Sequence, residues 1–162
     1  MSRFYSWLLT LILAFSIGCG RPTTATGPEG EKATVRQDGD GAGITIEGKQ
    51  GEKVQIAAGE AGVSLPDGFP KDVPVYPGAT VIASATAKNM MNVSLQTTDQ
   101  PQQVKTFYQE KLKQNGWETQ STMNVPQGTM LHATKDQRTQ MVTITRDEDK
   151  TVIALVVTEE KE

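Results

Sequence analysis

Four prolines fall within the twelve residues from Pro66 to Pro77, and they constrain the fold more than any other feature of this chain. Each proline fixes its own φ and lacks a backbone N–H, so this stretch cannot form a helix or a central strand. We expect an extended strap over residues 66–78, ending in a turn in which Pro77 takes the first corner and Gly78 accepts a positive φ. The strap separates two parts of the chain that both show β-strand patterns.

Before the strap, residues 34–65 carry short alternating apolar runs between Gly-rich turns. The runs recur about every nine or ten residues, which predicts a small Gly-rich β-meander or a few rungs of a solenoid. Each run has only one or two small apolar side chains, so we expect this region to be weakly stable alone and to depend on the residues that follow. The apolar positions are Val35, Ile44, Ile46, Val54, Ile56, Val63 and Leu65.

After the strap, residues 79–162 combine one helical pattern with six strand patterns. Runs at 80–86 and 91–97 predict a hairpin, and four more runs between residues 117 and 158 predict further strands. Between them lies one amphipathic helix, with Thr98 or Asp99 as its cap and a stop after residue 114. The predicted fold class is α+β: an antiparallel sheet with one packed helix in ββαββββ order, preceded by the meander. The helical positions are Val104, Phe107, Tyr108 and Leu112.

The last strand pattern, residues 152–157, does not alternate and is apolar throughout. A continuous apolar run is typical of a strand buried on both faces inside a sheet. One helix covers only one face of that sheet. The other face then needs the meander, the strap or another protein chain to cover it.

The first twenty residues have the composition of an export signal. Arg3 supplies a positive start, an almost uncharged apolar run from Trp7 to Ile17 is too short to span a bilayer, and a small residue precedes Cys19, the only cysteine. The segment resembles the bacterial lipoprotein signal peptide, in which an aliphatic residue, a small or β-branched residue, Gly or Ala and then Cys form the cleavage box. Ser16 stands where Leu is usual, and an ordinary secretory signal is the alternative.

The lipoprotein resemblance implies how the protein is placed in the cell. The signal peptide would be residues 1–18, and Cys19 would carry acyl chains such as palmitate as a membrane anchor. Residues 19–33 contain no large apolar side chain and would form a flexible tether. The resemblance implies a lipid-anchored protein of the cell envelope, at the outer membrane and facing the periplasm.

A second resemblance concerns roughly the last hundred residues. The stretch from Phe69 to Ala79, which contains Tyr-Pro-Gly-Ala, is followed by Phe107-Tyr108, Leu112 and Gly116-Trp117. This pattern is similar to one in uncharacterised bacterial envelope proteins and lipoproteins. It implies a small α+β domain in an exported setting and assigns no catalytic residue.

Charge and motifs argue against several function classes. Without residues 1–18 the chain keeps 15 of its 16 basic residues and all 19 acidic ones, a net charge of 15 − 19 = −4. The basic side chains are scattered, so we expect no nucleic-acid partner. The sequence has a single histidine, His132. It contains no Gly-x-Ser-x-Gly, P-loop or His-Glu-x-x-His motif. We therefore expect no enzyme activity, no catalytic residue and no cofactor.

A few soft side chains are the main candidate metal ligands, and the acidic turn of Asp147, Glu148 and Asp149 is a minor alternative. Met91, Met130 and His132 would suit Cu(I) in an envelope protein, although methionine is also a common filler of core gaps. Our leading hypothesis is a non-catalytic, lipid-anchored envelope protein that presents a protein-interaction surface. Its partners would be the membrane, through Cys19, and an envelope protein or a second copy of the chain. The alternative is a periplasmic module that binds a small ligand or a metal.

Overall fold

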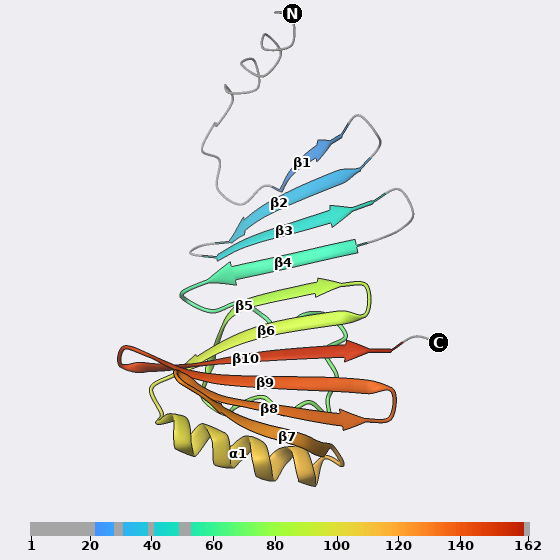
Figure 1. Cartoon of the computed structure of the whole chain (residues 1–162). Helices are drawn as coiled ribbons and strands as arrows, with labels where there is room; N and C mark the ends of the chain where they lie inside the picture. Colours follow the sequence, from blue (N-terminus) through green and yellow to red (C-terminus); the bar gives the residue numbers. More distant parts are fainter. Residues whose placement is uncertain (1–21, 28–30, 39–40, 49–52, 161–162) are drawn as a thin grey trace, which may run out of the picture.

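The computed structural model describes residues 22–27, 31–38, 41–48 and 53–160. In these residues ten strands form one antiparallel sheet in the order β1-β2-β3-β4-β5-β6-β10-β9-β8-β7, with one helix packed against it (Figure 1). The strands are β1 (Thr23–Thr26), β2 (Lys32–Asp38), β3 (Gly41–Glu47), β4 (Lys53–Gly59), β5 (Thr80–Ala87), β6 (Met90–Thr97), β7 (Glu118–Val125), β8 (Gly128–Lys135), β9 (Arg138–Asp147) and β10 (Lys150–Glu159), and the helix is α1 (Pro101–Gln114).

The predicted fold class was wrong. We expected an α+β domain in ββαββββ order preceded by a separate meander, and the structure is dominated by a single sheet with one short helix (Figure 1). The meander strands β2 to β4 join this sheet, because β4 pairs with β5 from Val54 opposite Ala87 to Ala58 opposite Ala83. A strand edge leaves backbone N–H and C=O groups unpaired, and β4 satisfies those of β5 by extending the sheet sideways.

The strands also reach further toward the N-terminus than expected. β1 lies within residues 19–33, the range predicted to be a flexible tether, and pairs with β2. That part of the expectation is corrected. The predicted signal peptide, residues 1–18, and the predicted acylation site Cys19 lie outside the described residues.

The core lies between α1, the strap and one face of strands β6 to β10. Val104, Tyr108 and Leu112 on the helix are fully buried against the sheet. Val73 and Tyr76 of the strap belong to the same buried cluster, so the strap covers the same face as the helix. From the sheet, the core takes Val93, Leu95, Leu131, Ala133, Val142, Ile144, Ile153, Leu155 and Val157.

The end of α1 fixes the position of Trp117. Gly116 adopts φ +79°, and its N–H donates to the carbonyl of Lys113 at 3.1 Å. The N–H of Trp117 donates to the carbonyl of Leu112 at 2.9 Å. These two bonds form a Schellman motif, which ends the helix and turns the chain sharply. Trp117 is thereby held under the strap, where its side chain is 3% exposed.

β10 lies in the middle of the sheet, between β6 and β9. We expected both of its faces to be buried, but only one is. Ile153, Leu155 and Val157 are buried, whereas the alternate residues Val152, Ala154 and Val156 are only half-buried. The strap packs on the same face as α1, and the meander extends the sheet at its side. In the described residues, therefore, no second layer covers the other face.

Candidate functional site

The sheet has an uncovered face, opposite α1 and the strap, which we call the open face. Directly opposed residues of an antiparallel pair lie on the same face, so strand pairing traces it across the molecule. Ile44 is opposite Ile56, Ile56 opposite Ala85, Ala85 opposite Asn92, and Asn92 opposite Val156. Since the residues flanking Val156 on β10 are core residues, the apolar side of the meander faces away from the core.

The open face is apolar and exposed on β2 to β4. Val35, Ile44, Ile46 and Ile56 are each 39% to 45% exposed. The described charged side chains of these strands lie on the opposite, helix side of the sheet: Lys32, Arg36, Glu47 and Lys53. A contiguous uncharged apolar patch on a protein surface usually marks an interaction site.

A cleft lies on the helix side of the same strands. Residues 61–67 and strands β3 to β5 enclose about 800 Å³, open to solvent. Among the described residues, Arg36 and Asp67 are the charged groups that line it, beside hydroxyls such as Ser84 and apolar side chains such as Val63. The single histidine lies outside this cleft, so no imidazole is present to activate the hydroxyl groups of the lining residues. The cleft does offer space for a small ligand.

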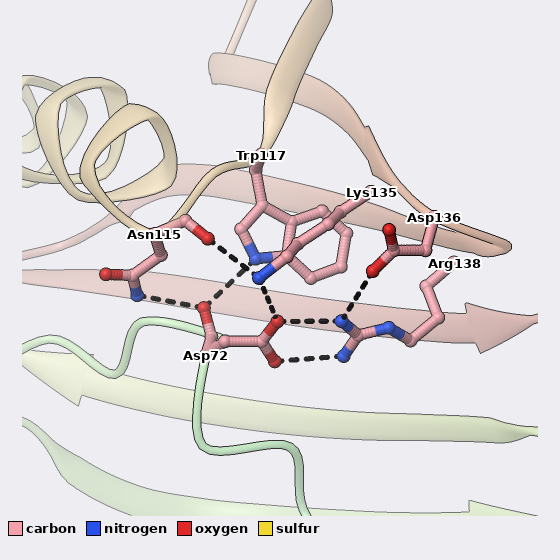
Figure 2. Close-up of polar contacts among 6 residues, drawn as sticks. All are labelled: Asp72, Asn115, Trp117, Lys135, Asp136 and Arg138. Atoms are coloured by element: carbon pink, nitrogen blue, oxygen red, sulfur yellow. Dashed lines mark hydrogen bonds and ion pairs between the residues drawn. The ribbon is translucent and has the colours of Figure 1, made fainter.

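The most extensive polar network joins the strap to the sheet and the helix (Figure 2). The Asp72 carboxylate accepts hydrogen bonds from both terminal nitrogens of Arg138, at 2.9 Å and 2.7 Å, and from Lys135 Nζ at 2.7 Å. The Asp72 carbonyl accepts from Asn115 Nδ2 at 2.9 Å and from Trp117 Nε1 at 3.0 Å. The Arg138 guanidinium lies 5.2 Å from the centre of the Trp117 ring. We call this network the Asp72 clamp.

The contacts of the Asp72 clamp hold the strap against the sheet and the end of the helix. The hydrogen bonds from Arg138, and after them those from Lys135, hold the pKa of Asp72 far below its usual range. The same carboxylate raises the pKa of Arg138. A carboxylate so strongly stabilised in its ionised form is a poor general base, because it has little tendency to take up a proton. Its bidentate pairing with Arg138 fixes the strap in place.

Residues of the envelope-protein pattern make a second contact between the strap and the helix, nearer the start of the helix. The Tyr76 hydroxyl donates to Asp99 Oδ2 at 2.7 Å, and the Tyr76 ring packs edge-on against Phe107 with 5.0 Å between ring centres. Phe107 in turn packs edge-on against Tyr108 at 5.2 Å. The pattern therefore describes how the strap docks on the helix, which is a packing role.

The predicted metal candidates do not come together. Met91 is opposite the buried Val157 and therefore lies on the helix side of the sheet. Its methyl group is close to Gly68 of the strap, 3.8 Å from the position that a Cβ atom would take there. Met130 and His132 lie on the open face, so the sheet separates them from Met91. No group of three or more His, Cys, Asp or Glu side chains in the described residues could hold a metal ion.

Sequence reasoning missed the Asp72 clamp and the sidedness of the meander. Asp72 is separated by 63 residues from Lys135 and by 66 from Arg138, and no local pattern links residues so far apart. The alternation in residues 33–58 does separate an apolar from a polar face. The alternation does not predict, however, which of these two faces lies on the same side of the sheet as the helix.

Fold and geometry define a sheet-dominated protein with one covered and one open face. The family described as START domain-like matches residues 79–151, from just before β5 to the start of β10, and this part of the chain is similar to that family. The match covers less than half of the 162 residues. Comparisons with curated proteins and with solved structures give no significant match. Within the described residues, no helix has the length and apolar character needed to cross a membrane.

Proposed function

We propose that this chain is a non-catalytic, lipid-anchored cell-envelope protein whose open face binds a second copy of the same chain. The observation that carries the proposal is the exposed, uncharged apolar surface of β2 to β4, which faces away from the core. Acyl chains on Cys19 would hold the protein at the outer membrane on its periplasmic side. Anchoring also confines the copies to one surface, which raises their effective concentration for pairing.

Charge supports self-association through this face. Two identical surfaces that meet about a twofold axis bring like charges close together wherever the surface is charged. From β2 to β5 the described open-face side chains are uncharged, so two copies meet there without repulsion. Two sheets that pack face to face at a spacing of about 10 Å bury such side chains between them, as in a β-sandwich.

The area of the face also supports a stable pair. Six adjacent strands, β2 to β6 and β10, form an uncharged part of the open face: it is apolar on β2 to β4, β6 contributes the polar Asn92, Ser94 and Gln96, and β10 contributes alternate residues of 152–158. With about 4.8 Å between strands and about 3.3 Å per residue, seven residues of each strand cover roughly 29 Å by 23 Å. Two such faces bury roughly 1,300 Å², within the range of specific protein interfaces.

Charge insertion tests the interface. We expect the full chain in detergent micelles to be a dimer by light scattering coupled to size exclusion, and Ile44→Glu to make it monomeric. Thr45→Glu is the matched control, since Thr45 is the next residue of β3 and lies on the helix side. That variant should remain dimeric.

Three outcomes would contradict the proposed pairing. A wild-type chain that is monomeric up to about 100 μM, a typical limit for weak association, would rule out a stable dimer. An Ile44→Glu variant that stays dimeric would place the interface elsewhere. A photo-crosslinker at position 44 that captures only a different envelope protein would make the open face a heterologous interface.

The anchor has its own test. Mass spectrometry of the mature N-terminus should find Cys19 as the first residue, carrying acyl chains, and Cys19→Ala should move from the membrane to the soluble fraction. An unmodified N-terminus would show that the chain is secreted without lipid. This result would leave the interface test unaffected.

The cleft supports a second candidate, a small-ligand module. START-like domains are typically ligand-binding. Much of the lining of this cleft, including Arg36, Gln55 and residues 61–67, lies before residue 79 and therefore outside the matched part. Because Arg36 is the one described basic group at the cleft, a medium-chain carboxylate such as octanoate is a suitable probe. Octanoate should raise the melting temperature of the wild type and not of Arg36→Gln, whereas an unchanged wild type would exclude this class of ligand.

A further inference from the structure

The only histidine of the chain lies among methionines at the far end of the open face. His132 on β8 is directly opposite Met141 on β9. Met130 is two residues earlier on β8, so its side chain shares the face with His132. Met123 on β7 is directly opposite Met130. Three of the six methionines in the sequence thus share this end of the open face with the one imidazole, whose direct neighbours across the strands are Met141 on β9 and Ser121 on β7.

The spacing of these residues allows their donor atoms to converge. Directly opposed residues in an antiparallel sheet have Cβ atoms about 4.5 to 5.5 Å apart, and residues two apart on a strand are separated by about 6.6 Å. Methionine has three rotatable side-chain bonds, so a thioether at either position can turn toward an ion beside the imidazole. The sheet holds the backbone of all four residues in a fixed register.

Gap filling does not explain these methionines. Met141 is 37% exposed and Met123 50% exposed, so both lie at the surface and fill no space in the core. Elsewhere on the open face, on β2 to β4, the large apolar side chains are Val and Ile. Thioethers replace branched aliphatic residues around the histidine, and the remaining open-face methionine, Met90 on β6, has β10 and β9 between it and β8.

From this arrangement we propose that His132, Met130 and Met141, with Met123 as a further thioether, form a binding site for Cu(I). Two or three thioethers and one imidazole are soft to borderline ligands, which favour Cu(I) over hard cations such as Mg²⁺ or Ca²⁺. The described residues contain no His, Cys, Asp or Glu group of three that would compete for the ion. Met91, on the helix side, takes no part.

Competition for Cu(I) against a chromophoric chelator under anaerobic conditions measures the affinity. The full chain in micelles should bind one ion, and both His132→Ala and Met141→Leu should weaken binding by at least about tenfold. Met91→Leu is the matched control, because it makes the same change on the other side of the sheet, and it should bind as the wild type does. Since a free thiol also binds Cu(I), every variant is measured in a Cys19→Ser background.

Methionine-methyl NMR provides a readout that does not depend on affinity. With Ag(I) as a redox-inert substitute, the methyl signals of Met123, Met130 and Met141 and the ring signals of His132 should shift, and those of Met90 and Met91 should not. The assignment would be overturned by the absence of binding, by binding that survives His132→Ala unchanged, or by an equal shift of Met91.

The copper test is independent of the pairing proposed above. β3 and β8 are separated by five strands in the sheet. Ile44→Glu should therefore abolish dimerisation and leave the affinity for Cu(I) unchanged. A loss of both together would place the metal in the dimer interface and contradict a site that is complete within one chain.

Discussion

The two halves of the sheet use the same alternation of apolar and polar residues for opposite purposes. In strands β6, β10, β9 and β8 the apolar residues face α1 and the strap, and residues such as Ile144 and Ile153 are fully buried. In strands β2 to β4 the apolar residues face the other way, and Ile44 and Ile56 are 39% and 45% exposed. The hydrogen-bonded backbone is continuous across both halves, but between β4 and β5 the apolar residues change from the open face to the helix-covered face.

This difference shows that hydrogen bonding and side-chain burial can be separated within one sheet. The meander satisfies its backbone groups by pairing with β5. Its apolar side chains gain little from that pairing, because none of the described residues forms a layer over the open face. A single sheet layer is weakly stable unless one of its faces is packed. The apolar side chains of the meander are therefore free to contact a partner, whereas those of the other half already pack against the helix and the strap.

The strongest test of the comparison is a matched pair of isoleucine truncations. Ile144→Ala, on β9, should lower the free energy of unfolding by about 3 to 4 kcal/mol, since it leaves a cavity in the core. Ile44→Ala, on β3, should cost less than about 1 kcal/mol in the monomer, because Ile44 is already 39% exposed. Urea unfolding of dilute protein measures both, and equal losses would show that the two halves are packed alike.

Protein concentration sharpens this test. If two copies pair through the open face, the cost of Ile44→Ala should grow with concentration, whereas that of Ile144→Ala should not. A concentration-independent cost for Ile44→Ala would mean that the open face stays uncovered in solution.

The elements were predictable where their signals are local. The helical spacing of Val104, Tyr108 and Leu112 located α1, and Asn115-Gly116 located its end, because a helix and its stop depend on neighbouring residues. The predicted cap, Thr98 or Asp99, was wrong: Gln100 takes that position in the structure, and the Asp99 carboxylate accepts a hydrogen bond from the Tyr76 hydroxyl instead.

The candidate sites were predictable only in part, for a related reason. Alternation correctly placed Met130 and His132 on one face of their strand. Met91 was grouped with them wrongly, since the face it occupies depends on strand order and register across β6, β10 and β9. Met141 and Met123 were not chosen, because only pairing between strands brings them beside β8.

A second substitution removes the Asp72 clamp, which holds the strap on the helix-covered half of the sheet. Asp72→Ala should cost about 2 kcal/mol at neutral pH, since it removes the charge-assisted bonds to Arg138 and Lys135. Thermal unfolding should show a loss of about 4 to 8 °C for a chain of this size. Asp67→Ala is the control: it removes an acidic residue of the same loop that lies outside the clamp. Similar losses in both variants would contradict a specific role for Asp72.

The pH dependence of this effect has a defined sign. Because the pKa of Asp72 is lowered in the folded state, its stabilisation is present above the unfolded value of about 4 and is lost as the pH falls toward the folded value. The wild type should therefore lose stability on acidification below about pH 4 more steeply than Asp72→Asn. Parallel acid-denaturation curves for the two proteins would show that Asp72 is not paired in solution.

The smallest predicted effect concerns the hydroxyl that joins the strap to the start of the helix. Tyr76→Phe keeps the edge-on packing against Phe107 and removes the hydrogen bond to Asp99, so it should cost about 1 kcal/mol near neutral pH. The adjacent Asp99 carboxylate raises the pKa of Tyr76 in the folded state, so the stabilisation is present below the unfolded value of about 10 and is lost as the pH rises further. The difference between wild type and variant should therefore shrink above pH 10. Hydrogen exchange then locates the effect. Amides of α1 and β10 should exchange faster in Tyr76→Phe, whereas those of β2 to β4 should not change. The meander is joined to the sheet by backbone hydrogen bonds but does not pack against the strap residues near Tyr76.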